Sequence, residues 1–230
     1  MIRHTAFFML RPDSTPEQQL WMLKGLAHMR FHCESVVALD CGSDLFGGSR
    51  TRLETDPWKR TPRWRSQQIG PPCNYDVALM LDFDDMAGME AYNVDDTHHE
   101  VGLYNASIAH GEITARTDWE YEGAPRITRG HVRHSAMFVW DGEVSDSDKE
   151  QALDDLRSLE AAKGVESLVV GKNFGKHPTD YDFIVDIAVP DQAAAAELIN
   201  GKAYADVMAK LAPVVQLEWT ARMSHVMRGV

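Results

Sequence analysis

Two blocks of alternating apolar and polar positions run along the chain, and they resemble each other. Residues 2–8 (IRHTAFF) and residues 132–138 (VRHSAMF) are short, mostly apolar and led by Arg-His, a pattern typical of a β-strand. The predicted strands cover residues 2–8, 35–40, 75–83 and about 112–121 in the first block, and residues 132–138, 166–170, 181–189 and about 213–222 in the second. We place Trp119 and Trp219 at equivalent positions of the two last strands.

Helix signals follow the first strand of each block. The run from Asp13 to Glu17 puts a capping residue before Pro16 at the first helical position, and Ser145 begins a similar run before a helix predicted near residues 147–163. Shorter helices are predicted at residues 85–93 and 191–200, each followed by another helical stretch. Each block therefore has the order β-α-β-β-α-β of a ferredoxin-like unit.

The repeat predicts how the chain is organised. A ferredoxin-like sheet carries its helices on one face, and its other, apolar face must be buried. Packing two such sheets against each other buries both faces. We therefore predict an α+β protein in which two fused ferredoxin-like units form a dimeric-type α/β barrel within one chain. The first unit spans residues 1–125 and the second spans residues 126–230.

A long loop at residues 43–74 distinguishes the first unit from the second. It contains Trp58 and Trp64 within a locally basic stretch, whereas the second unit has about ten residues at this place. Loops of this length in compact domains are usually functional or disordered. Two interpretations stay open: a lid that contacts substrate through Trp58 and Trp64, and an arm that packs on a neighbouring subunit.

Composition excludes several classes of protein. A net charge of -12 argues against nucleic acid as a partner. No apolar run approaches the roughly 18 residues that cross a bilayer, so no membrane partner is expected. The short apolar segment near the N-terminus does not fit a signal peptide, and the chain has three cysteines, none in a CxxC pair. We expect a cytoplasmic protein with no metal and no cofactor.

Histidines supply the candidate chemistry. The imidazole of His98 can take up and return a proton near neutral pH, but the same residue could be an exposed histidine in an acidic stretch beside His99. His28 and His32 are spaced i, i+4 on the first helix, as a metal pair could be, although no third ligand is evident. A polar helix face explains that pair more simply.

These residues together resemble the stress-responsive dimeric A/B barrel (Dabb) family. The resemblance rests on the Arg-His of the first strand, the β-α-β-β-α-β order and a histidine after the second helix, and it covers both halves outside the long loop. Plant polyketide cyclases of that family use a tyrosine and a histidine six residues later, a spacing that Tyr92 and His98 reproduce. The family's first-strand histidine corresponds to His4. The resemblance implies apolar pocket positions at Ala6, Phe8, Met22, Leu23, Leu26, Leu79 and Leu81.

The second half departs from the family pattern. Leu198 stands at the tyrosine position and Tyr204 at the histidine position, although His134 still matches the first-strand histidine. The second half is therefore expected to be a structural partner that closes the barrel. This asymmetry locates the candidate chemistry in the first half.

Two functions follow as hypotheses. The first is a cofactor-independent lyase or cyclase in which His98 is the acid or base, assisted by Tyr92 and His4. It would act on an apolar, aromatic or polyketide-like small molecule by aldol or retro-aldol cleavage, dehydration or cyclisation. The second is a non-catalytic module that binds a small ligand or partner. A pocket of ~300 Å³ or more with His98 and Tyr92 facing in would favour the enzyme. The fused barrel could also form a homodimer.

Overall fold

The computed structural model describes residues 1–47, 73–124, 127–175, 177 and 180–229. Trp58, Trp64 and most of the long loop lie outside the described residues, so their predicted roles stay predictions. Among the described residues, no helix is both long and apolar enough to cross a membrane.

The first half contains one four-stranded antiparallel sheet. Its strands are β1 (Ile2–Phe8), β2 (Ala38–Ser43), β4 (Val77–Phe83) and β5 (Ala115–Glu120), in the order β2-β4-β1-β5. Its helices are α1 (Pro16–His32), α3 (Met86–Asn93) and α4 (Asp96–Ile108), followed by the short turn η2 (Gly111–Ile113). This connectivity is the predicted ferredoxin-like order.

The second half repeats this arrangement. Its strands are β6 (Val132–Phe138), β7 (Ser167–Lys172), β8 (Phe183–Val189) and β9 (Ala221–Val226). The two-residue β3 (Cys73–Asn74) joins β9 in parallel, so the sheet order is β3-β9-β6-β8-β7. Its helical segments are α5 (Asp146–Arg157), η3 (Ser158–Ala161), α6 (Gln192–Asn200), α7 (Lys202–Leu211) and η4 (Leu217–Trp219).

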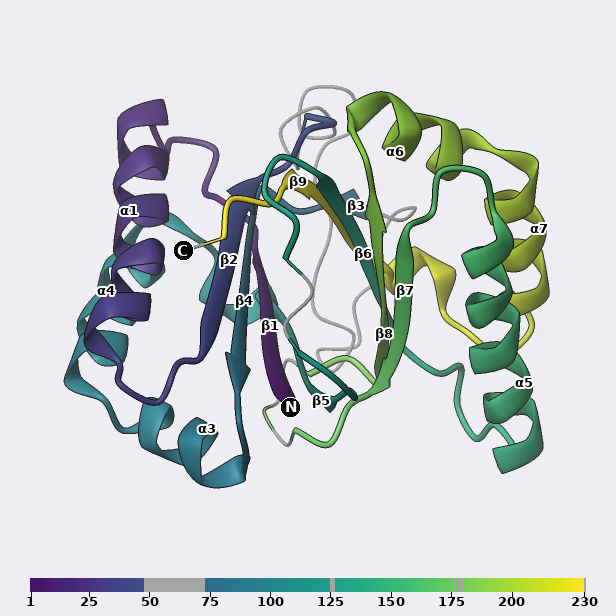
Figure 1. The fold of residues 1–230 in the computed structure, drawn as a ribbon, viewed down its shortest axis with the longest axis horizontal. Helices are drawn as coiled ribbons and strands as arrows, with labels where there is room; N and C mark the ends of the chain where they lie inside the picture. The colour runs from purple at the N-terminus through teal and green to yellow at the C-terminus, as the bar shows by residue number, and fades with distance from the viewer. Residues whose placement is uncertain (48–72, 125–126, 176, 178–179, 230) are drawn as a thin grey trace.

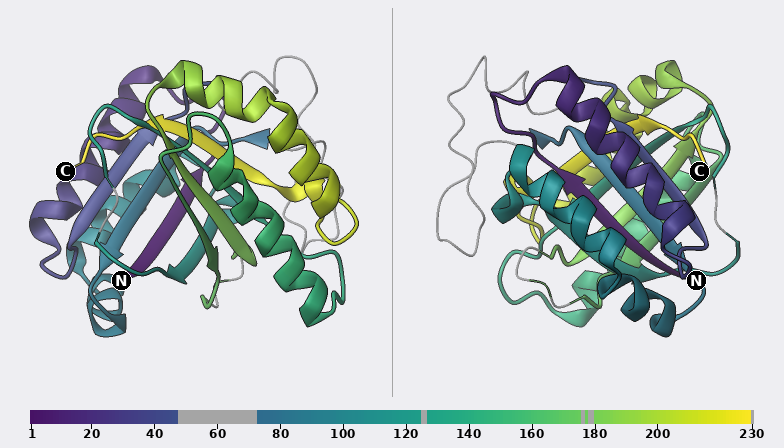
Figure 2. Two further views of the ribbon diagram at one scale, coloured as in Figure 1. Left: turned by 45° about the vertical axis from the view of Figure 1, so that its right-hand side comes forward. Right: turned by 90° about the vertical axis from the view of Figure 1, so that its left-hand side faces the viewer.

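The two sheets pack face to face, with one set of helices on each outer side (Figure 1). The turned views show the same layers, with α1 and α4 side by side over the first sheet (Figure 2). At the edges, β2 lies beside β9 and β5 lies beside β7. The predicted fold class is confirmed: two fused ferredoxin-like units form a barrel within one chain.

The predicted last strand of the second half is wrong. Residues 217–219 form the turn η4, and β9 begins only at Ala221. Both last strands begin Ala-Arg, so Trp119, fifth in β5, corresponds to His225, fifth in β9, and Trp219 is not its equivalent. The residues before β9 are apolar because they pack in the core: Val214, Val215 and Leu217 on the second half's helices and Trp219 between the sheets. An apolar run of this length resembles a strand in the sequence.

Capping side chains start the helices where the sequence predicts. The Thr15 hydroxyl accepts the backbone N–H of Gln18, and the Gln18 side-chain oxygen accepts the Thr15 N–H. Pro16 is the first helical residue. Ser145 caps α5, and Asp85 caps α3 in the same way. These bonds satisfy backbone donors that a helix start otherwise leaves without partners.

Three apolar clusters hold the layers together. One packs α1, α3 and α4 on the first sheet, and another packs the second half's helices on its sheet. The third lies between the sheets, where Phe7, Met80 and Trp119 of the first half share one apolar cluster with Met137 and Ile184 of the second. Burying two apolar sheet faces is the main favourable contribution to this arrangement.

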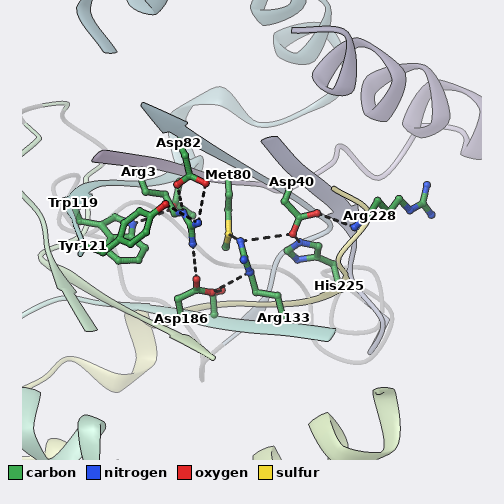
Figure 3. A network of polar contacts seen from close by, with 12 residues as sticks. Arg3, Asp40, Met80, Asp82, Trp119, Tyr121, Arg133, Asp186, His225 and Arg228 are labelled. Carbon is green, nitrogen blue, oxygen red and sulfur yellow. Dashed lines mark hydrogen bonds and ion pairs between the residues drawn. The ribbon is translucent and has the colours of Figure 1, made fainter. Parts of the chain in front are cut away.

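Buried charges cross the space between the sheets (Figure 3). The Arg3 guanidinium bonds Asp82 of its own sheet at 2.7 and 2.9 Å and Asp186 of the other sheet at 2.7 Å. Arg133 lies 3.5 Å from Asp186 and 3.7 Å from Asp40. Because an unpaired charge is very costly in a core, these pairs favour one register of the two sheets over others.

Two glycines let the edges of the sheets approach. A Cβ added to Gly42 of β2 would come within 2.9 Å of the His225 side chain in β9. A Cβ added to Gly171 of β7 would come within 2.3 Å of the Trp119 ring in β5. Since carbon atoms in contact normally stay about 3.5–4.0 Å apart, both edges need glycine, which has no side chain, at these positions.

Candidate active site

A cavity of about 120 Å³ lies between the first sheet and its helices. Its walls come from β1, β4 and β5 on one side and from α1, α3 and α4 on the other. The lining residues are His4, Ala6, Phe8, Leu26, Met29, Leu79, Tyr92, His98, Val101, Gly102, Asn105, Ala106, Ala109, Gly111, Thr114 and Arg116. The cavity is smaller than the ~300 Å³ expected of a drug-sized ligand site.

His4 forms a close pair with Asp118 at the sheet side of this cavity. The two residues are opposite each other in the β1–β5 pairing, and His4 Nδ1 lies 2.6 Å from Asp118 Oδ1. Each side chain is 17% exposed. A carboxylate only accepts hydrogen bonds, so Nδ1 carries the proton and Nε2 of a neutral ring is the proton acceptor.

Tyr92 and His98 face this pair from the helices. The Tyr92 ring stacks on His98 with centroids 4.1 Å apart and lies 6.1 Å from the His4 ring. Tyr92 lies in the last turn of α3, and the Asp95 cap starts α4 so that His98 falls on its first turn. The structure therefore brings together all three residues predicted to be catalytic.

The Tyr92 hydroxyl is a hydrogen-bond donor rather than a base. It is buried and points to Met29 Sδ at 3.9 Å. Burial raises the pKa of Tyr92 well above its usual value, so the phenol stays protonated at neutral pH. A thioether is a weak acceptor, and a substrate oxygen would be a better partner for this hydroxyl.

His98 is half-buried and neutral at pH 7. Burial lowers its pKa to about 4, and repulsion of a second positive charge by the His4 and His99 rings acts in the same direction. Its Nδ1 is buried without a hydrogen-bond partner among the described residues. This ring lines the cavity and binds a proton weakly.

Asn105 and Arg116 add polar groups that the sequence analysis did not identify. Asn105 is 5% exposed, lines the cavity and keeps its Oδ1 without a partner among the described residues. Arg116 lines the cavity from β5, and burial lowers the pKa of its guanidinium. An orphaned buried acceptor costs free energy that a donor on a ligand would recover.

The predicted apolar positions divide into two groups. Ala6, Phe8, Leu26 and Leu79 line the cavity. Met22, Leu23 and Leu81 belong to the surrounding helix–sheet core and do not line it. Parity on β1 accounts for Ala6 and Phe8, because they and His4 alternate with residues that face the other sheet.

The described residues contain no group of three or more His, Cys, Asp or Glu side chains that could hold a metal ion. The His28 and His32 rings stack with centroids 3.8 Å apart on α1, without a third ligand within the described part of the chain. Two ligands fall short of the three or four that zinc sites use.

The second half uses the matching position for structure. His134 is fully buried, with Nδ1 2.8 Å from the Ser224 hydroxyl and Nε2 3.1 Å from the Tyr204 hydroxyl. Burial lowers the pKa of His134 to about 3. Both ring nitrogens thus have protein partners, in contrast to His4.

No known family model matches the sequence, and a search of curated proteins finds no match. An anthrone oxidase-like protein of known structure covers 100% of this chain and 92% of its own, at 12% identity and a TM-score of 0.63. At this identity the match shows the fold alone.

Single-repeat structures match one half of the chain. A Dabb family protein with a ferredoxin-like fold from Mesorhizobium loti is 22% identical over 43% of this chain and 97% of its own, with a TM-score of 0.38. A hydroxynitrile lyase from Passiflora edulis is 12% identical over 43% of this chain and 94% of its own, with a TM-score of 0.38. Neither half-length match supports an argument about function.

Proposed function

We propose that the first half of the chain is a cofactor-independent acid–base enzyme of the lyase class, related to the Dabb family. The observation that carries the proposal is the Asp118–His4 pair, whose 2.6 Å contact leaves Nε2 as the proton acceptor beside a cavity. A carboxylate that fixes the tautomer of a histidine also stabilises the imidazolium that forms when it takes a proton. His4 is thus the general base of the proposal.

The other side chains have complementary roles. Tyr92, kept protonated by burial, donates a hydrogen bond to an oxygen that gains negative charge. His98, with a pKa lowered to about 4, is better suited to hydrogen bonding than to proton abstraction at pH 7. This assignment exchanges the roles that the sequence suggested for His98 and His4.

A retro-aldol cleavage illustrates the chemistry. His4 Nε2 removes the hydroxyl proton of a β-hydroxy carbonyl substrate, the carbon–carbon bond breaks, and its electron pair moves into an enolate. Tyr92 stabilises the enolate oxygen, and the His4 imidazolium returns the proton to carbon. The reaction is redox-neutral and uses a single proton that His4 takes up and gives back.

The size of the cavity favours a compact substrate. A dry cavity of ~150 Å³ holds one benzene molecule, so 120 Å³ suits about one ring or a short branched chain. Asn105 Oδ1 has no other partner among the described residues and would accept a hydrogen bond from a substrate hydroxyl. We therefore favour a small hydroxylated molecule over an extended polyketide chain.

Turnover of a panel of one-ring and short β-hydroxy carbonyl compounds tests the proposal. His4→Asn and Asp118→Asn should each lower kcat by ~100- to 10,000-fold, because proton transfer in the transition state contributes that much. His28→Asn is the matched control, since it changes a histidine outside the cavity and should retain full activity. Unchanged kcat in both site variants would refute the assigned role.

The small volume also favours a second function, a binding module without catalysis. Here the same cavity would hold a small ligand through Asn105. Saturable binding of panel compounds without any product, in the wild type and in His4→Asn alike, would favour this module over the enzyme.

A further inference from the structure

A turn from the second half lies against the candidate site in the first. Residues Asn173–Gly175 follow β7 and contact β5, the strand that carries Asp118. The Asn173 side-chain oxygen accepts the Asp118 backbone N–H at 2.7 Å, and the Phe174 N–H donates to the Asp118 carbonyl at 2.8 Å. Both backbone polar groups of Asp118 are therefore held by the other repeat.

The turn also forms a wall behind the Asp118 carboxylate. A Cβ added to Gly175 would lie 2.8 Å from Asp118 Oδ2 and 2.5 Å from Asp180 Oδ2. Asn173 Oδ1 additionally accepts the Gly175 N–H at 3.1 Å, which fixes the turn in this position. A methyl group at residue 175 would thus collide with the carboxylate that bonds His4.

The turn leaves the His4 side of Asp118 accessible. Asp118 Oδ2 faces Gly175, whereas Oδ1 is the atom 2.6 Å from His4 Nδ1. Nearby, the Tyr181 N–H donates to the Arg116 carbonyl at 2.9 Å, so the end of this loop is tied to β5 as well. The orientation of the carboxylate is consequently set from both repeats.

We propose that Asn173 and Gly175 are positioning residues, which act through Asp118 to hold His4 with its proton on Nδ1. The inference rests on the proposed function insofar as His4 is the base, and it assigns the second repeat a part in the site. That repeat has Leu198 and Tyr204 in place of a Tyr–His pair, but it completes the site of its neighbour. A first repeat alone would therefore have an incompletely oriented His4.

Nitrogen NMR of the full-length protein labelled with ¹⁵N-histidine tests this positioning directly. Long-range ¹H–¹⁵N spectra distinguish the two imidazole tautomers, and the His4 signals are assigned by their loss in His4→Gln. We expect the Nδ1–H form in the wild type and a shift toward the Nε2–H form in Gly175→Ala. Gly88→Ala, where the added Cβ meets ordinary contacts of 3.6 Å or more, should keep the wild-type tautomer.

A second pair of variants keeps the test decisive if Gly175→Ala does not fold. Asn173→Leu removes the acceptor for the Asp118 N–H and should also shift the tautomer. Asn173→Asp, a separate variant that keeps an acceptor, should retain the Nδ1–H form. A His4 that stays in the Nδ1–H form in folded Gly175→Ala and Asn173→Leu would overturn the inference.

The spectra and the kinetics separate this inference from the proposed function. If the variants shift the tautomer and lower kcat with KM unchanged, both stand. If they shift the tautomer while no panel compound is turned over by the wild type, the positioning stands and the proposed function fails.

Discussion

Gly171 is the position at which one added methyl group should most strongly disturb the barrel. It lies in β7 where that strand meets β5, and a Cβ there would approach Trp119 to 2.3, 2.5 and 2.8 Å at three ring atoms. The Trp119 ring is fully buried, donates from Nε1 to Thr5 Oγ1 at 3.1 Å and has the Arg3 guanidinium 5.5 Å from its centroid. The ring cannot move away without breaking these contacts.

The expected cost of Gly171→Ala follows from this overlap. The shortest distance is more than 1 Å below the ~3.5 Å of a normal carbon contact. Overpacking of this kind typically lowers the free energy of unfolding by about 1–3 kcal/mol. Because the added Cβ is fixed to the strand backbone and the Trp119 ring is held by its contacts, we expect a loss of about 3 kcal/mol. The lower conformational entropy of unfolded alanine offsets only about 0.4–1 kcal/mol. A net loss of about 2 kcal/mol corresponds to a fall of roughly 4–8 °C in Tm for a chain of this size.

Urea unfolding followed by far-ultraviolet circular dichroism measures this loss. Gly88→Ala is the control, because its Cβ meets nothing closer than 3.6 Å and alanine favours the helix in which it lies. Combining Gly171→Ala with Trp119→Phe should recover part of the lost stability, as a double-mutant cycle would reveal. A Gly171→Ala protein within 0.5 kcal/mol of wild type, or strict additivity in the cycle, would refute the proposed overlap.

Three further changes test other parts of the structure. Arg3→Leu leaves Asp82 and Asp186 without their shared cation and should cost about 3–5 kcal/mol in urea unfolding; a loss below 1 kcal/mol would contradict the buried network. Since burial lowers the folded-state pKa of His134 from 6.5 to about 3, the unfolded chain takes up a proton first as the pH falls, and stability falls with it. This proton uptake should lower the free energy of unfolding by about 2 kcal/mol at pH 5, and the loss should be absent in His134→Asn. Urea unfolding at pH 7 and pH 5 measures the loss, and equal pH dependence in both proteins would argue against it. Asn105→Leu should weaken binding of phenol, but not of toluene, by ~10-fold in calorimetric titration; parallel losses for both probes would exclude a polar contact.

Local patterns were sufficient to predict most of the fold. Arg-His at the start of each block, the caps at Thr15 and Ser145, and alternating apolar positions define the repeated elements without any tertiary information. The last strand of the second half was the exception. Its residues Ser224 and His225 are polar, and they are buried because other elements supply their partners, such as Asp40 for His225. The hydrophobic pattern of the sequence does not reveal which residues become those partners.

The candidate site was only partly predictable for a related reason. His4, Tyr92 and His98 were found through the family resemblance, and the structure does bring them together. Asp118 needed the register of β1 against β5, and Asn105 needed the packing of α4 over the sheet. Alternation along the predicted strand at residues 112–121 places Asp118 and Arg116 on one face, but it does not show that this face meets His4.

Covalent continuity between the repeats, through residues 121–131, has a consequence for how the protein behaves on dilution. Two separate chains joined only by their sheets would dissociate as concentration falls, and each pair would carry two equivalent cavities. A short tether instead sets an effective concentration of the order of millimolar for one repeat toward the other, whatever the amount of protein in solution. The two repeats of the fused chain therefore stay paired whatever the dilution, and their sequences can differ because neither repeat has to pack against a copy of itself.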